Sequence, residues 1–201
     1  MSQDQTDISS VCNIIEHLAR YKLVRALANK KPADPFRESF EAQIISRSGK
    51  IFNPECVVEM EQDEEVKFTF ELKVKNKGNK DLYVYLYDLG PCWQVQDIYR
   101  GSCEVIPLQN SNLGFTGIFR KRLRIMVPPE MREKGHRQCK DIIKVFITSK
   151  PTSFDLLELP KIGSSKLAKR NSSTTGRTGR EDSDTPEEWV ALNFPIHTSL
   201  K

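Results

Sequence analysis

The fold of this chain is decided by the stretch VKFTFELKVKNKGNKDLYVYLYDLGPCW, which spans residues 66–93. Apolar and polar residues alternate strictly over 66–74, and this period of two is typical of a strand with one buried face. A polar turn over 76–81 follows, and a second alternating strand over 82–87 ends before a Gly-Pro pair. The stretch therefore predicts two neighbouring antiparallel strands at the core of a β-domain.

Shorter apolar runs on both sides of this stretch predict further strands, which begin near residues 40, 56, 93, 105, 123, 142 and 189. Roughly seven or eight short strands separated by turn residues are typical of a sandwich. We therefore predict a mainly β fold, an antiparallel two-sheet (immunoglobulin-like) sandwich with an N-terminal amphipathic helix. Trp93 starts a strand after a turn, so we expect it to be buried between the sheets. The expected core contains Phe68, Phe70, Leu72, Leu82, Val84, Leu86, Trp93, Ile143, Val145, Ile147 and Phe194.

The other segments flank this sandwich. Apolar residues recur at three- and four-residue spacing near the N-terminus, which predicts an amphipathic helix that Pro32 and Pro35 end. Ser, Thr, Gly and charged residues dominate a late segment, which predicts a disordered insertion. The expected organisation is a disordered leader at 1–7, the helix at 8–30, the β-sandwich at 36–162, the disordered insertion at 163–188 and the final strand at 189–198.

Composition limits the cellular setting. The chain has 201 residues, a formal net charge of +4 and five cysteines. No signal peptide is visible, and no apolar run reaches the roughly 20 residues that a membrane-spanning helix needs. An odd number of cysteines without a signal peptide favours free thiols in a reducing compartment. We therefore expect a soluble, cytoplasmic protein without a membrane span, in which every cysteine is reduced.

No motif predicts catalysis, a metal site or a cofactor. His136 and Cys139 lie close together, but catalytic pairs normally meet through the fold, and Cys139 lacks the glycine that follows a caspase-type cysteine. Together with Cys103, these residues also lack the CxxC and HxxxH spacings of zinc sites. Cys12 lies on the predicted helix, where we expect it to pack in the core.

A basic cluster is formed by Arg120, Lys121, Arg122 and Arg124. Binding of nucleic acid or anionic lipid would require these charges to gather on one face. Their alternation with Leu123 instead favours an exposed, solvated strand face.

Three segments resemble a known domain. They are KDLYVYLYDLGPCWQV at 80–95, CKDIIKVFITSKPTSFDLLELPKI at 139–162 and EEWVALNFPIHT at 187–198. They look like the β-domain that follows the peptidase domain in many fungal caspase-like proteins. IIEHLARYK at 14–22 resembles the segment that opens that domain. The family's catalytic residues lie in an α/β peptidase domain, and no stretch of this chain resembles it.

The resemblance implies a non-catalytic accessory domain that binds another protein or domain, with a caspase-like peptidase domain as the candidate partner. A regulatory subunit that acts in trans on a caspase-like peptidase or cell-death pathway is an alternative, and a basic domain that binds anions or nucleic acid is the least favoured. Any part of the helix stripe that the sheet leaves uncovered would mark a partner surface, and tyrosines suit such surfaces. The expected partner-binding residues are Tyr83, Tyr85, Tyr87, Ile15 and Leu23, and no cofactor is expected.

Overall fold

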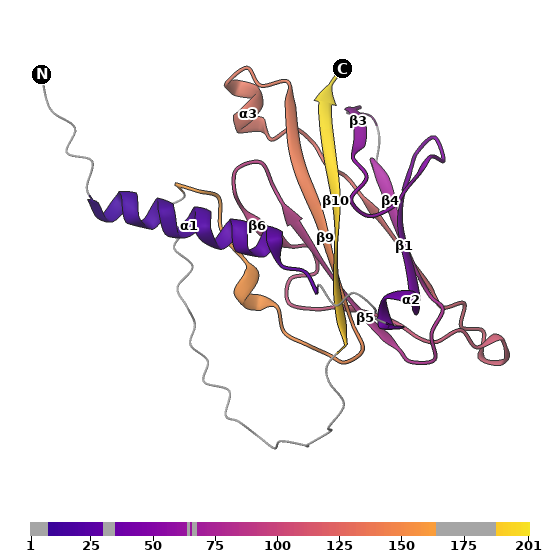
Figure 1. Cartoon of the computed structure of the whole chain (residues 1–201). Helices are drawn as coiled ribbons and strands as arrows, with labels where there is room; N and C mark the ends of the chain where they lie inside the picture. The colour runs from indigo at the N-terminus through magenta and orange to yellow at the C-terminus, as the bar shows by residue number, and fades with distance from the viewer. Residues whose placement is uncertain (1–7, 30–34, 64, 66–67, 164–187) are drawn as a thin grey trace, which may run out of the picture.

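The computed structural model describes residues 8–29, 35–63, 65, 68–163 and 188–201. Within them the chain is mainly β, with two sheets and a long N-terminal helix, α1 (Ile8–Ala26), as the sequence predicts (Figure 1). The segments expected to be disordered lie outside the described residues, apart from Gly163 and Glu188. Shorter elements lie in the connections: α2 (Pro35–Glu38), α3 (Pro129–Glu133) and 3-10 turns at Ser111–Leu113 and Asp155–Leu157.

One sheet has four strands, is antiparallel throughout, and is called the small sheet below. Its strands run in the order β2 (Ile51–Phe52), β1 (Phe40–Ser46), β4 (Phe70–Asn76) and β8 (Ile118–Leu123). The predicted alternation is visible in β4, which buries Phe70, Leu72 and Val74 and leaves the residues between them half-buried.

The other sheet, called the large sheet below, is mixed, so the expectation that both sheets are antiparallel is wrong for it. Its strands run in the order β3 (Val58–Gln62), β10 (Trp189–Leu200), β9 (Gln138–Thr148), β5 (Leu82–Leu89) and β6 (Val95–Asp97), and β7 (Glu104–Ile106) also pairs with β5. β10 is parallel to β3 and antiparallel to β9. The last strand of the chain, yellow in Figure 1, therefore lies inside the sheet and pairs on both sides.

Buried side chains from both sheets form one apolar cluster. In the large sheet, Leu86 lies opposite Val145, and Ile143 lies opposite Phe194 on the other neighbouring strand. Because side chains alternate along a strand, these inner residues share one face and meet the inner face of the small sheet. Of the expected core residues, only Phe68, which is half-buried, and Trp93 lie outside the buried set.

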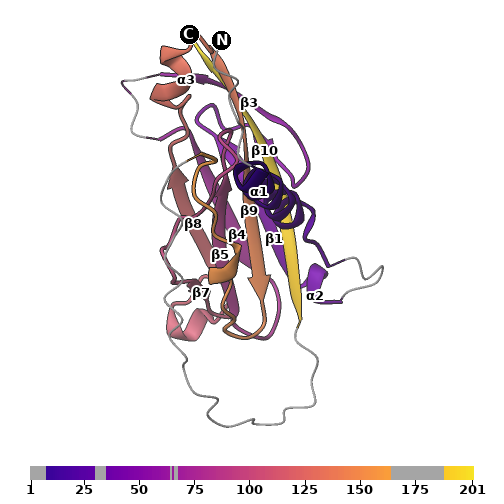
Figure 2. The same cartoon turned by 90° about the vertical axis from the view of Figure 1, so that its left-hand side faces the viewer.

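The outer face of the large sheet is also covered. Tyr21 and Val24 of α1 join Tyr85, Tyr87 and Phe146 in a second buried cluster. Figure 2 shows α1 nearly end-on, lying across β9 and β10 on this face. The segment that follows β9 covers another part of it, since Phe154 stacks on Phe146 with ring centroids 4.5 Å apart. The large sheet is thus buried on both faces over β5 and most of β9.

The expectation that Trp93 is buried between the sheets is wrong. The chain turns sharply after β5, where the Gly90 N–H donates to the Gln94 carbonyl at 3.0 Å. A Cβ on Gly90 would meet the end of the Gln94 side chain, which would have to move. Trp93 adopts a left-handed φ of 60° in this turn. Its side chain is 38% exposed, and its ring lies edge-on against Tyr21 of α1.

These positions predict different costs for two aromatic truncations. Phe194→Ala should lower the free energy of unfolding by about 3–5 kcal/mol, because it empties a fully buried site. Trp93→Ala should cost about 1 kcal/mol, the value of one aromatic pair. Urea denaturation of both variants measures the difference. A Trp93→Ala cost that equals the Phe194→Ala cost would contradict the exposed position of Trp93.

Candidate functional site

One side of α1 holds the helix on the large sheet. Tyr21 and Val24 are buried, and the Tyr21 hydroxyl lies 3.5 Å from the carbonyl oxygens of Leu89 and Gly90. Beyond the end of the helix, the Asn29 amide donates to the Trp189 carbonyl at 2.9 Å. These contacts fix the second half of α1 to the end of β5 and to the start of β10.

A buried cation completes this attachment. Lys144 of β9 is fully buried, and its Nζ donates to the Arg25 carbonyl at 3.1 Å and to Asn193 Oδ1 at 3.0 Å. Arg25 lies in the last turn of α1, where carbonyls lack helical partners and the helix dipole favours positive charge. Burial lowers the pKa of Lys144 to about 8. The ammonium group therefore caps α1 from inside the protein.

The opposite side of α1 carries a stripe that faces away from the sheet. The α1 stripe consists of Ile8, Val11, Ile15 and Leu18, which share one face because they recur at spacings of three and four. Ile8 is 80% and Ile15 61% exposed, while Leu18 is half-buried. Val24 follows Ile15 by nine residues, about half a turn around the helix axis. Figure 1 shows the first half of α1 projecting beyond the sheet.

The helix residues expected to bind a partner are on the surface. Ile15 and Leu23 are both exposed, and Ile15 belongs to the α1 stripe. Cys12 is exposed on the projecting half, so the expectation that it packs in the core is wrong. Partner binding by Ile15 and Leu23 stays a prediction.

The expected tyrosine surface is different. Tyr83, Tyr85 and Tyr87 do share the outer face of β5, but Tyr85 and Tyr87 are buried and Tyr83 is half-buried. The segment after β9 covers them: Phe154 packs edge-on against Tyr85, and the Thr152 N–H donates to the Tyr85 hydroxyl at 2.7 Å. The expectation of an exposed tyrosine face is therefore wrong for Tyr85 and Tyr87. Strand periodicity finds their common face but not the segment that covers it.

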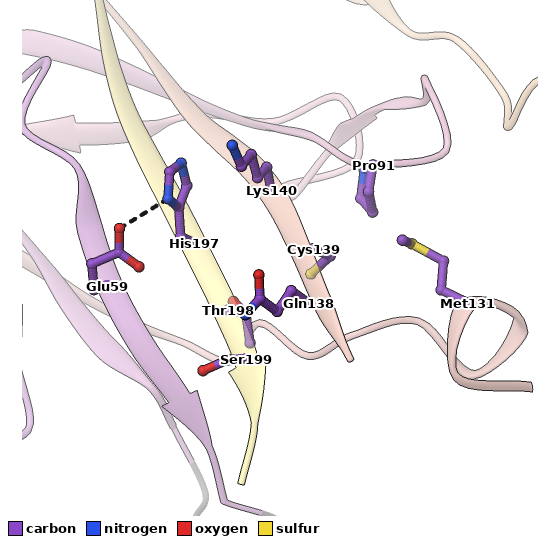
Figure 3. A pocket seen from close by; sticks show the side chains of 9 residues that line it. All are labelled: Glu59, Pro91, Met131, Gln138, Cys139, Lys140, His197, Thr198 and Ser199. Atoms are coloured by element: carbon purple, nitrogen blue, oxygen red, sulfur yellow. Dashed lines mark hydrogen bonds and ion pairs between the residues drawn. The ribbon is translucent and has the colours of Figure 1, made fainter. Parts of the chain in front are cut away.

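A hollow of about 440 Å³ lies at the end of the large sheet (Figure 3). On its rim, His197 Nδ1 of β10 lies 2.9 Å from Glu59 Oε1 of β3, and Lys140 lies directly opposite His197 on β9. The pair is exposed to solvent. A base at His197 would need a nucleophile beside it, and Cys139 is the thiol at this hollow.

Cys139 does not meet an imidazole. It neighbours Lys140 on β9 and so points to the opposite face from His197. Its thiol donates to Asp141 Oδ2 at 3.2 Å, and burial raises its pKa to about 12. His136 is exposed, whereas Cys139 is buried. The thiol is therefore held in its protonated form, which is a poor nucleophile.

The basic cluster is divided between two faces. Arg120 and Arg122 are exposed and both pair with Glu71 of β4. Lys121 points the other way, with its Nζ 4.9 Å from the centre of the Tyr99 ring. This arrangement fits the predicted solvated strand face. Among the described residues, no group of His, Cys, Asp and Glu side chains is placed to hold a metal ion.

Two carboxyl groups, the buried Asp141 and the half-buried Asp88, lie near Cys139 on the inner face of the large sheet. Burial raises the pKa of Asp141 to about 6. Burial, together with the nearby Asp141, raises the pKa of Asp88 to about 7. One oxygen of Asp88 has no hydrogen-bond partner in the described part of the chain. Both acids therefore keep their protons to a higher pH in the native structure than in the unfolded chain.

Sequence reasoning missed Lys144 and this acid pair, although signals for both were present. Lys144 interrupts the continuous apolar run Ile142–Ile147, and such a run is typical of a strand that is buried on both faces. A lysine in this position needs a buried hydrogen-bond acceptor for its ammonium group. Asp88 occupies the apolar side of its own alternation, two residues after Leu86. A charged residue in such a position indicates burial with a shifted pKa.

No protein-family model, curated protein or solved structure matches the chain. The resemblance to the β-domain of caspase-like proteins thus stays a prediction. The described residues include no helix with the length and apolar character needed to cross a bilayer.

The acid pair predicts an unusual dependence of stability on pH. On folding, the pKa of Asp88 rises from 3.8 to about 7 and the pKa of Asp141 rises from 3.8 to about 6. At a pH between the unfolded and the native pKa values, the native state therefore binds more protons than the unfolded chain. The free energy of unfolding should therefore fall as pH rises from 5 to 7.5, by about 2–4 kcal/mol. Lys144 does not contribute, because it stays largely charged in both states below pH 7.5.

The measurement is urea denaturation across this pH range, for the wild type and for Asp88→Asn/Asp141→Asn. Asparagine resembles the neutral acid in shape, so the double variant should lose most of the slope. An unchanged slope in the variant, or a wild-type stability that rises with pH, would show that the pair is ionised in the native state.

Proposed function

We propose that this chain is a non-catalytic binding module in which an immunoglobulin-like sandwich presents α1 to another protein. The proposal rests on one observation, the exposed apolar α1 stripe on a helix whose other side is fixed. A short helix has little stability in water without tertiary contacts. The projecting half of α1 makes few such contacts, so a partner that covers the α1 stripe would stabilise it.

The residues along α1 define the chemistry of the partner. Glu16 is the only Asp, Glu, Lys or Arg residue between positions 8 and 19, so the stripe itself suits an apolar groove. Lys22 is exposed and continues the line of the stripe one turn after Leu18. The fitting occupant is a folded domain with an apolar groove and an acidic group at the end that meets Lys22. This is the helix-in-groove mode of recognition.

The resemblance suggests where such a groove occurs. In the caspase-like proteins that this chain resembles, the segment matching α1 joins the β-domain to the peptidase domain. We therefore propose a caspase-like peptidase domain as the partner, bound in trans. The chain would act as an accessory or regulatory subunit, and the exposed helix would replace the covalent connection.

The test is direct binding, by isothermal titration, between this chain and a caspase-like peptidase domain encoded in the same genome. Ile15→Asp places a charge in the centre of the α1 stripe and should weaken binding at least tenfold. Leu113→Asp is the matched control, because Leu113 is 68% exposed in a distant loop, and it should bind like the wild type. Circular dichroism and thermal unfolding would establish that both variants are folded.

Two results would overturn the proposal. One is a wild type that binds no such peptidase domain, or that binds equally well when Ile15 is replaced. The other is a concentration-dependent dimer of the wild type that Ile15→Asp abolishes, which would assign the α1 stripe to a second copy of this chain.

A further inference from the structure

A second cavity, of about 360 Å³, lies on the outer face of the large sheet, away from the α1 stripe. Its floor is formed by Tyr85 and Tyr87 of β5 and its wall by Phe154. The loop over 101–103 and the segment over 151–153 close the other sides. Hydrogen bonds hold both boundaries, since the Asp97 carboxylate accepts the Gly101 N–H and the Tyr85 hydroxyl accepts the Thr152 N–H.

The aromatic rings that line the cavity are held in place from behind. Phe154 stacks on Phe146 and lies edge-on against Tyr85 at 4.9 Å between ring centroids. Tyr87 lies edge-on against Phe146 at 5.8 Å. Rings fixed in this way form a preorganised wall, and aromatic faces attract cations through their quadrupole.

The Tyr87 hydroxyl is left without a partner. The side chain is only 1% exposed and lines the cavity, yet its hydroxyl makes no hydrogen bond with any described residue. A buried hydroxyl normally has a partner, because desolvation without one is costly. The cavity is the open side from which a partner can reach this hydroxyl.

Two carboxylates line the same space. Asp97 and Asp155 line the cavity, and no Lys or Arg is among the described residues that do so. Asp97 is buried and lies directly opposite Tyr87 in the strand pairing, while Asp155 is exposed at the mouth. Burial and the charges of Asp97, Asp155 and Glu158 all raise the pKa of Tyr87, which is the response expected in a negative field.

We propose that this cavity binds the positively charged side chain of a peptide, a lysine ammonium or an arginine guanidinium. The rings of Tyr85 and Phe154 contact the alkyl part and the cation, the Tyr87 hydroxyl accepts a hydrogen bond from it, and Asp155 attracts it at the mouth. The ammonium and guanidinium groups share this chemistry, and the peptide series below distinguishes them. This site is independent of the α1 stripe.

The probes are four peptides of the form acetyl-Gly-Ala-X-Ala-Gly-amide, in which X is Lys, Arg, norleucine or Glu. Each is titrated into the full chain labelled with ¹⁵N, at low and at high salt. The Lys peptide, the Arg peptide or both should shift the amide signals of residues 97–103 and 152–155, with weaker binding at high salt. Norleucine keeps the alkyl chain without the charge, so its peptide and the Glu peptide should leave these signals unchanged.

Three variants assign the binding to the cavity. Asp155→Asn removes the charge at the mouth and Tyr87→Phe removes the hydroxyl while keeping the ring, and each should weaken binding at least threefold. Glu133→Gln removes an exposed carboxylate on α3 and should have no effect. The proposal is overturned if neither basic peptide shifts these signals, if norleucine shifts them equally, or if Asp155→Asn and Tyr87→Phe bind like Glu133→Gln.

Discussion

The burial of Lys144 is the constraint on which the attachment of α1 depends. An ammonium group inside a protein is tolerated only when hydrogen-bond acceptors replace the water it has lost. Here the acceptors are the Arg25 carbonyl and the Asn193 side chain, and Asn193 in turn donates to Glu55 at 3.1 Å. This chain of contacts joins the connection after β2, the last strand, β9 and α1. Without the last turn of α1 above it, Lys144 would lose one of its two acceptors.

The same attachment explains why the helix keeps an exposed apolar stripe. The side that faces the sheet uses a tyrosine, a valine and a backbone carbonyl, so the isoleucines of the α1 stripe are not needed for it. A helix that packed through Ile15 would have to rotate by about half a turn. That rotation would withdraw Tyr21 and Val24 from the cluster on the outer face of the large sheet. The orientation of the stripe is therefore a consequence of the anchor.

The strands of the core were predictable from sequence because each has one face in a common interior. The period of two in β4 and β5 depends only on local geometry, so it survives folding unchanged. Positions covered by distant segments could not be predicted in the same way. Tyr85 and Tyr87 share a face in the sequence pattern, but the segment that buries them follows about 65 residues later. Trp93 escapes the interior because a tight turn gives it a left-handed backbone, which no periodicity reveals.

The central claim is that α1 is fixed at its second half and exposed at its first, and native-state amide hydrogen exchange of the free chain tests it most directly. The amides of residues 20–26 should exchange at least a hundredfold more slowly than those of 12–16, although both groups lie within one helix. In Lys144→Met, the protection of 20–26 should fall towards that of 12–16, because the Arg25 carbonyl loses its partner. Equal protection along the whole of α1 in the wild type, or unchanged protection in the variant, would contradict the account.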